Sequence, residues 1–132
     1  MAPAPDVGSS PRIGIFGGTF DPPHVGHVVV ARDVADALAL DRVLWVPARV
    51  SPHKLDRPVS SPAVRLEMVR AAAAEDPRFQ VSEAELARAG PSYTVDTLRE
   101  LQALWPAAEL YLILGADQLR VFASWRGPGE IL

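Results

Sequence analysis

The chain has 132 residues, a length typical of a single domain with its own core. Its 48% hydrophobic and 22% charged residues are typical of a globular protein, and the net charge of −3 argues against a sequence-independent nucleic-acid binder. The absence of cysteine excludes disulfides, thiolate metal sites and a cysteine nucleophile, and it suits a reducing compartment, so we expect a cytoplasmic protein. No apolar run approaches the length of a membrane span.

Residues 1–11 are rich in Ala, Pro, Ser and Gly, and we expect a disordered leader there, followed by one domain over 12–132. Beyond the leader, short apolar runs alternate with apolar residues at helical spacing. In chain order the predicted elements are a strand over 13–16, a helix over 28–40, a strand over 43–46, a loop over 48–60, a helix over 62–76, a strand over 79–81, a connection over 84–91, a helix over 94–105, a strand over 109–114 and a short helix over 116–123.

Two of these helices carry sequence signals for their starts. Ser61 is suited to be an N-cap because Pro62 follows at the first helical position. Ser92 or Thr94 is expected to cap the later helix. The apolar stripe predicted for that helix comprises Val95, Leu98, Leu101 and Leu104.

The alternation of strands and helices implies right-handed crossovers, a mainly parallel sheet and a three-layer α/β/α architecture. Residues 13–16 and 111–114 lack polar alternation, which is typical of central strands covered on both faces. In such sheets ligands bind beyond the carboxyl ends of strands where the strand order reverses. Residues 17–27 and 115–117 each follow a predicted strand and therefore lie at such ends.

The segment 17–27 is the most informative stretch of the chain. Gly17 and Gly18 end the first predicted strand and let the backbone approach a ligand closely. His24 and His27, three residues apart, are predicted to share one face of the first turn of the next helix. A helix N-terminus also offers unpaired N–H groups and a positive dipole end. Together these features predict a polyphosphate site, and hence a nucleotide site.

Several other nucleotide and metal sites are excluded. The sequence has no G-x-x-x-x-G-K-[ST], so it is not a P-loop protein, and no G-x-G-x-x-G after its first strand, which argues against a nicotinamide-dependent dehydrogenase. It has no H-E-x-x-H, and two histidines are too few for a structural zinc site. No metal site made by protein ligands is predicted.

Residues 18–27, Gly-Thr-Phe-Asp-Pro-Pro-His-Val-Gly-His, resemble the nucleotidyltransferase superfamily, whose signature is a glycine turn followed by [HT]-x-G-H. Further segments occur in the order found in the bacterial nicotinate-nucleotide adenylyltransferases. These are Ser-Pro-His-Lys at 51–54, Gly-Pro-Ser-Tyr-Thr at 90–94, Leu-Gly-Ala-Asp at 114–117 and Ser-Trp at 124–125. The resemblance covers 12–132 and implies the Rossmann-like nucleotidyltransferase fold. Phosphopantetheine adenylyltransferases share the first motif but typically have Thr at the position of His24.

The resemblance implies direct transfer of an adenylyl group from ATP to nicotinate mononucleotide in NAD biosynthesis, with loss of pyrophosphate. His24 and His27 would donate hydrogen bonds to the ATP phosphates, and the alternative is that they merely cap the helix or lie on a solvated face. The glycine turn with its next two residues would complete the ATP site, with backbone contacts from Gly17, Gly18, Thr19 and Phe20. Mg²⁺ would be held mainly by phosphate oxygens and water. Asp21 is as readily a turn-forming residue as a catalytic one.

The resemblance also assigns the acceptor side. Lys54 would clamp a phosphate, against the alternative of a solvated loop, and the roles of Arg49, His53 and Arg57 stay open. Tyr93 and Thr94 begin a helix whose N-terminus favours the nicotinate carboxylate. The other residues assigned to the mononucleotide are Gly115, Asp117 and Trp125. Asp117 would bond ribose hydroxyls or cap a helix, and Trp125 would stack on the pyridine ring or pack in the core. Trp45 and Trp105 are expected in the core.

The sequence departs from the family in one respect. A later Ser-[Ser/Thr]-Thr-x-x-Arg segment, which helps to bind the ATP phosphates in the family, does not occur among the 132 residues. We therefore expect a domain that lacks its C-terminal part, with an exposed sheet edge that favours a homo-oligomer. Three hypotheses stay open: adenylyl transfer to nicotinate mononucleotide, nucleotide binding without turnover, and transfer to another acceptor such as phosphopantetheine.

Overall fold

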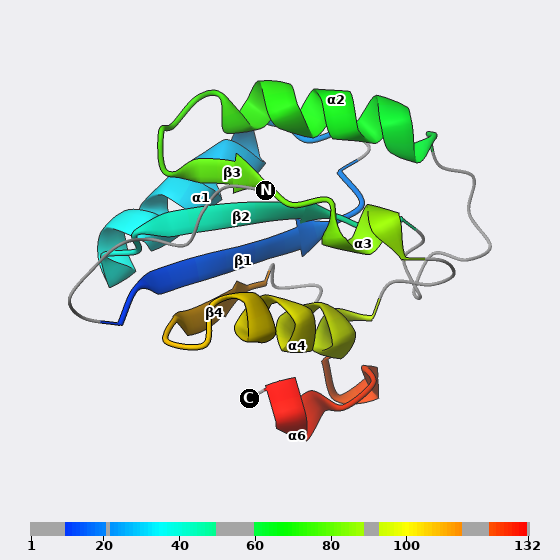
Figure 1. Ribbon diagram of the computed structural model, residues 1–132. Coiled ribbons are helices and arrows are strands. Elements are labelled where there is room, and N and C mark those ends of the chain that lie inside the picture. Colours follow the sequence, from blue (N-terminus) through cyan, green and yellow to red (C-terminus); the bar gives the residue numbers. More distant parts are fainter. Residues whose placement is uncertain (1–9, 21, 50–59, 89–92, 115–121, 132) are drawn as a thin grey trace.

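The computed structural model describes residues 10–20, 22–49, 60–88, 93–114 and 122–131. The strands are β1 (Arg12–Gly18), β2 (Arg42–Pro47), β3 (Phe79–Val81) and β4 (Glu109–Ile113). The helices are α1 (Val25–Leu38), α2 (Pro62–Ala73), α3 (Ala84–Ala87), α4 (Thr94–Leu104), the 3-10 turn η1 (Phe122–Ser124) and α6 (Pro128–Ile131). Figure 1 shows them in chain order by colour.

The four strands form one sheet in the order β3-β2-β1-β4, and every described pair is parallel. Ile15 of β1 lies opposite Leu44 of β2 and Leu112 of β4, which sets the register at the centre of the sheet. The chain adds strands outward from β1 through β3 and then returns to the other side of β1. The strand order therefore reverses between β1 and β4, and the carboxyl end of β1 lies at the position where such sheets bind ligands.

Helices cover both faces of the sheet, which confirms the three-layer α/β/α prediction (Figure 1). On one face, Val28 and Ala31 of α1 and Val69 of α2 pack with the buried Phe16 and Trp45 of the sheet. On the other face the helical contribution comes from α4. The buried residues of the core on this second face are Ile13, Ile15, Leu44, Val46, Leu101, Trp105 and Ala108. Trp45 and Trp105 therefore both lie in the core, as predicted.

The predicted strands are all present, and the Ser61 cap is confirmed because its side chain accepts a hydrogen bond from the Val64 N–H at 3.3 Å. Helix α1 begins at Val25, three residues earlier than predicted, and ends at Leu38 because Ala39 adopts a left-handed conformation (φ 51°). The predicted cap at Thr94 is wrong. Thr94 is the first residue of α4, and Tyr93 occupies the N-cap position without a side-chain cap bond.

Three other expectations are corrected or fall outside the described residues. The connection over 84–91 contains helix α3, and Leu104 of the predicted apolar stripe is 48% exposed. Pro11, placed in the leader, is buried, and its carbonyl accepts a hydrogen bond from the Glu109 N–H at 2.8 Å. Residues 1–9, Ser92 and 116–121 of the predicted short helix lie outside the described residues. None of the helices in the described part of the chain is long and apolar enough to cross a membrane.

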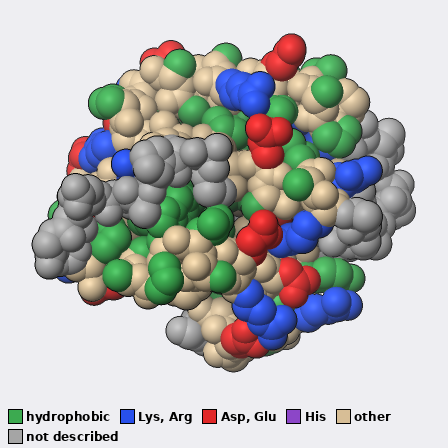
Figure 2. All heavy atoms as spheres, viewed as in Figure 1, with side chains coloured by type: hydrophobic (Ala, Val, Ile, Leu, Met, Phe, Trp, Pro, Cys, Tyr) green, Lys and Arg blue, Asp and Glu red, His purple; other side chains and the backbone are tan. Residues whose placement is uncertain are grey.

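Acidic and basic side chains lie next to one another on the face shown in Figure 2, including the region of α4 and α6. Arg88 pairs there with Glu100 at 3.3 Å, and Arg99 pairs with Glu130 at 2.5 Å. A second network joins α1 to the segment before β3. The Arg78 side chain donates two hydrogen bonds to the buried Asp76 carboxylate (3.1 and 2.9 Å) and a third to Asp36 of α1 (2.8 Å).

We predict that Asp76→Asn lowers the free energy of unfolding by about 1–3 kcal/mol, because hydrogen bonds to a charged, buried carboxylate are lost. The Arg78 hydrogen bonds lower the pKa of Asp76 from its ordinary value of 3.8 to about 2. The stabilisation is therefore fully present above pH 3.8 and is lost as the pH falls toward 2. Urea titrations of the wild type and the variant at pH 7, and at pH values from 4 down to 2, measure both effects.

The matched control is Asp36→Asn, since the Asp36 side chain binds the same guanidinium but is 71% exposed. Its effect should stay below about 1 kcal/mol. If the two variants lost equal free energy of unfolding at neutral pH, Asp76 would not be the residue through which this network stabilises the fold.

Candidate functional site

Strand β1 ends with Gly17 and Gly18, which pair with Val46 and Pro47 of β2, and the chain leaves the sheet at Thr19; residues 17–20 are called the glycine turn below. The Gly18 carbonyl accepts a hydrogen bond from the Ala48 N–H at 2.9 Å, so the turn is tied to the first residue after β2. Phe20 follows in a left-handed conformation (φ 50°), which is uncommon for a residue with a bulky side chain. Its ring is 4% exposed and packs edge-on against Phe16, with centroids 5.5 Å apart. A contribution of Phe20 to ATP binding would therefore come from its backbone.

The two histidines close the first turn of α1 with a reciprocal pair of hydrogen bonds. His24 is the N-cap, and its Nδ1 accepts a hydrogen bond from the Gly26 N–H at 3.1 Å. His27 is the third residue of the helix, and its Nδ1 accepts one from the His24 N–H at 2.9 Å. This is a capping box made by imidazoles in place of the usual Ser/Thr and Glu/Gln. The two histidines therefore do cap the helix, which was the alternative to phosphate binding. Capping uses only one nitrogen of each ring.

The capping box determines what each ring can offer to a ligand. A neutral imidazole has one donor and one acceptor nitrogen, so a ring whose Nδ1 accepts must carry its hydrogen on Nε2. The two rings lie with centroids 3.9 Å apart. Both His24 and His27 therefore keep an Nε2–H donor for a ligand at the start of α1. Two adjacent donors at a helix N-terminus are suited to phosphate oxygens.

The packing around His27 keeps its ring in place and uncharged. The His27 ring packs against the rings of Phe20 (5.2 Å between centroids) and Phe16 (5.8 Å). Burial and, secondarily, the neighbouring His24 lower the pKa of His27 below its ordinary value of 6.5. At neutral pH the ring is therefore neutral, which is the form whose Nδ1 can accept the capping bond.

Gly26 is required by this arrangement. A Cβ at this position would lie 2.9 Å from Cε1 and 3.0 Å from Nδ1 of His24, so the His24 ring would have to shift. The glycine between the two histidines therefore leaves the room into which the His24 ring folds back.

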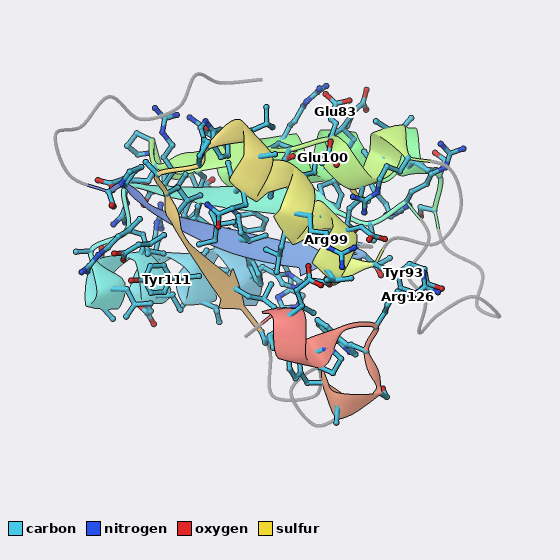
Figure 3. All side chains as sticks on the ribbon, turned by 60° about the horizontal axis from the view of Figure 1, so that its bottom comes forward. Glu83, Tyr93, Arg99, Glu100, Tyr111 and Arg126 are labelled. Atoms are coloured by element: carbon cyan, nitrogen blue, oxygen red, sulfur yellow. The ribbon has the colours of Figure 1, made fainter. Side chains whose placement is uncertain are left out.

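The predicted acceptor residues are only partly described. Tyr93 and Trp125 come from distant segments, and Arg126 joins them because its guanidinium lies 3.8 Å from the centroid of the Tyr93 ring (Figure 3). Trp125 is half-buried and packs on Phe122, with centroids 5.2 Å apart. The Arg49 side chain donates to the Leu86 carbonyl at 3.3 Å. The remaining predicted residues, which lie outside the described residues, are Asp21, His53, Lys54, Arg57, Gly115 and Asp117.

A buried polar network that the sequence did not indicate holds the start of α4. The Thr97 hydroxyl donates to the buried Glu85 carboxylate at 2.6 Å, and Arg88 donates to the same hydroxyl at 2.7 Å. Because Glu85 lies on α3 and Thr97 on α4, the network fixes the residues on both sides of 89–92. Glu, Arg and Thr are all common on helix surfaces. Nothing in the neighbouring sequence therefore marks Glu85, Arg88 and Thr97 as a buried network.

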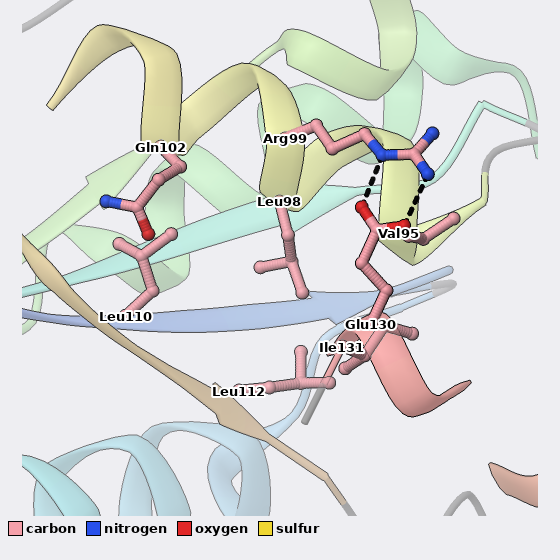
Figure 4. A pocket seen from close by; sticks show the side chains of 8 residues that line it. All are labelled: Val95, Leu98, Arg99, Gln102, Leu110, Leu112, Glu130 and Ile131. Carbon is pink, nitrogen blue, oxygen red and sulfur yellow. Dashed lines mark hydrogen bonds and ion pairs between the residues drawn. The ribbon is translucent and has the colours of Figure 1, made fainter. Parts of the chain in front are cut away.

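A pocket of about 340 Å³ lies between α4, β4 and α6 (Figure 4). Its walls are mainly aliphatic, and the Arg99–Glu130 ion pair crosses its rim. The lining residues are Val95, Leu98, Arg99, Gln102, Leu110, Leu112, Glu130 and Ile131. The glycine turn and the histidine pair do not contribute to it, so it is separate from the predicted nucleotide site.

Metal ligands are not gathered in the described part of the chain, where no three His, Asp or Glu side chains form a group that could hold an ion. The histidine nitrogens expected at this site suit phosphate oxygens, whereas Mg²⁺ requires oxygen ligands. The turn therefore fits a metal that arrives on phosphate oxygens.

The Cytidylyltransferase-like family matches residues 15–132. Among curated relatives, the chain is 54% identical over 121 residues to a protein of Thermus thermophilus named "Probable nicotinate-nucleotide adenylyltransferase", covering 92% of this chain and 63% of the relative. A protein of the same name from Geobacillus thermodenitrificans is 46% identical, with 92% and 56% covered. The chain thus spans 56–63% of the length of these relatives.

The fold also matches a solved structure. A nicotinic acid mononucleotide adenylyltransferase of Plasmodium falciparum, complexed with NaAD, superposes with a TM-score of 0.79. The sequences are 21% identical, and the match covers 92% of this chain and 60% of that chain. At this identity the match supports the predicted Rossmann-like nucleotidyltransferase fold and nothing finer.

We predict that Gly26→Ala lowers the free energy of unfolding by about 1 kcal/mol, because the new Cβ displaces the His24 ring and removes a cap. Ala normally stabilises a helix relative to Gly, so a loss here is diagnostic. Gly129→Ala is the matched control. Gly129 is likewise the second residue of a helix, α6, and a Cβ there meets nothing within 4 Å. Thermal unfolding of both variants measures the difference, and equal stabilities would refute the role given to Gly26.

Proposed function

Since the chain belongs to the cytidylyltransferase-like family, we propose that it serves adenylyl transfer from ATP to nicotinate mononucleotide, forming deamido-NAD and pyrophosphate. The observation that carries the proposal is the capping box of His24 and His27, in which both Nδ1 atoms accept backbone N–H groups and leave Nε2 for a ligand. The names of the relatives that are about 50% identical support the choice of acceptor.

In the proposed reaction a phosphate oxygen of the mononucleotide forms a bond to the α-phosphorus of ATP. The bond from that phosphorus to the oxygen bridging to the β-phosphate breaks, and pyrophosphate leaves with the bonding electrons. No protein nucleophile is needed, so catalysis consists of positioning and charge stabilisation. His24 and His27 donate hydrogen bonds to the phosphate oxygens on which charge grows, and the backbone N–H groups at Gly17, Gly18 and Thr19 do the same.

The capping box supports this role for the histidines. Each ring is held by a hydrogen bond at Nδ1, so its Nε2–H is oriented before ATP binds, and no ordering of the ring is needed during the reaction. Mg²⁺ would be held by ATP phosphate oxygens and water, and it would supply partial neutralisation of the phosphate charge. The described residues supply no competing ligand set.

The acceptor is bound by residues around the start of α4. Tyr93 makes no side-chain cap bond at the N-terminus of this helix, and the positive end of the helix dipole there favours an anion such as the nicotinate carboxylate. The Glu85–Thr97 bond holds this helix start in position, and Arg126 joins it to the segment of Trp125. Lys54, Gly115 and Asp117 are proposed to bind the mononucleotide on the strength of the resemblance alone.

A second candidate is nucleotide binding without turnover. The chain spans 56–63% of the length of the relatives that carry the enzyme's name, so binding and turnover are separate questions for it. ATP binding and pyrophosphate release must therefore be measured separately.

The test incubates the chain with ATP, Mg²⁺ and nicotinate mononucleotide and follows pyrophosphate, with ATP binding measured by calorimetry. We expect release that depends on the mononucleotide and exceeds the release with nicotinamide mononucleotide or phosphopantetheine. Binding without release would select the second candidate. Release with phosphopantetheine as the preferred acceptor would contradict the assignment of the acceptor.

The variant His27→Gln separates the two roles of the ring. Gln at the third position of a capping box accepts the N-cap N–H, so the cap is kept, and the loss of stability from weaker packing on Phe16 and Phe20 should stay below about 1.5 kcal/mol. The imidazole Nε2–H is lost, so turnover should fall about 10²–10³-fold. If the variant turned over as fast as the wild type, His27 would have no role beyond capping.

A further inference from the structure

We infer that Arg65 is a positioning residue that sets the glycine turn against the loop that follows β2. The inference rests on the proposed function only in that this turn is taken to hold ATP. Arg65 lies in the second turn of α2, and its side chain is fully buried (0% exposed).

The guanidinium of Arg65 donates to backbone carbonyls of three separate segments. Its Nη1 donates to the carbonyl of Thr19 at 3.1 Å and to the carbonyl of Ala48, and its Nη2 donates to the carbonyl of Arg49 at 3.0 Å. Its Nε donates to the carbonyl of Ser60 at 3.0 Å. One side chain thus connects the glycine turn, the first residues after β2 and the residue before the α2 cap.

These contacts determine where the proposed binding segments start. Thr19 directly follows the paired glycines, and Arg49 and Ser60 are the described residues on either side of 50–59, the range that contains Lys54. The Ala48 N–H donates in turn to the Gly18 carbonyl at 2.9 Å. Arg65 therefore ties both flanks of that range to the ATP side of the site.

The contact with Thr19 also bears on the strained backbone of the turn. The Thr19 carbonyl belongs to the peptide that precedes Phe20, whose φ is 50°. A conformation of this kind persists only where surrounding contacts over-determine it. Arg65 holds this peptide from one side, while the packing of the Phe20 ring holds it from the other.

Arginine is suited to this role in a way that lysine is not. A guanidinium is planar and presents five N–H donors in fixed directions, whereas an ammonium has three donors on one atom. The four carbonyls are contacted through Nε, Nη1 and Nη2, which lysine cannot reproduce. Arg65→Lys keeps the charge and removes the simultaneous contact with three segments.

The test compares Arg65→Lys with Arg70→Lys in the full chain. Arg70 lies on the same helix, but its side chain is 56% exposed and pairs with Glu83 at 3.1 Å. Two quantities are measured under conditions in which circular dichroism shows each variant folded: hydrogen exchange of the Ala48 amide without ligand, and the Kd for ATP by calorimetry.

For Arg65→Lys we expect faster exchange at Ala48 and ATP affinity weaker on the order of 10- to 100-fold, since small misplacements of binding groups have effects of this size. Arg70→Lys should match the wild type in both. Addition of methylguanidine to Arg65→Ala should restore Ala48 protection and ATP affinity together. A purely structural role would lower stability but leave the Kd of the folded fraction unchanged.

The inference is overturned if folded Arg65→Lys keeps wild-type Ala48 exchange and ATP affinity. It is also overturned if methylguanidine restores the fold of Arg65→Ala without restoring Ala48 protection, or if neither variant can be obtained folded. If the wild type itself binds no ATP, the proposed function fails, whereas the exchange measurement still decides whether Arg65 sets the turn.

Discussion

The first turn of α1 depends on two imidazole nitrogens that accept backbone N–H groups. A helix N-terminus has N–H groups without intrahelical partners, and His24 and His27 satisfy two of them with their Nδ1 atoms. This constraint determines the tautomer and the orientation of both rings. It also requires Gly26, because any larger residue would collide with the His24 ring. The same two hydrogen bonds therefore cap the helix and orient the rings of the proposed phosphate site.

The topology places this helix start where a ligand can use it. The strand order β3-β2-β1-β4 leaves the carboxyl end of β1 beside the reversal point of the sheet. Buried polar side chains gather on the same side of the fold: Arg65 holds the loops after β1 and β2, and Glu85 with Thr97 holds the start of α4. Buried polar groups must be hydrogen-bonded, so each of these contacts specifies one loop arrangement.

The sequence predicted most of the fold because its signals there are local. Apolar runs marked all four strands, and the Ser61-Pro62 pair marked the start of α2. Helix α3 was missed because four residues carry too little periodicity, and the contact between Glu85 and Thr97 that holds it is tertiary. Leu104 was assigned to the core from its spacing, although α4 turns that position to solvent.

The site was predicted in part for the same reason. The glycine–histidine segment is contiguous, so its location followed from the sequence, but the capping box depends on ring orientations that residue types do not reveal. Arg65 was missed because an arginine in a helical pattern normally lies on the exposed face. One signal was available, since Arg65 precedes the buried Val69 and Ala73 by four and eight residues and so lies on their stripe.

The central claim is that the rings that cap α1 through Nδ1 bind ATP phosphates through Nε2. Nitrogen-15 NMR of the histidine side chains, recorded at pH 7.5 while ATP is added, tests it most directly. We expect both rings to carry a hydrogen on Nε2 and none on Nδ1 before ATP is added, and ATP then to shift the Nε2 signals while the Nδ1 signals hardly change. A hydrogen on Nδ1 of either ring, or Nε2 signals that do not respond to bound ATP, would contradict it.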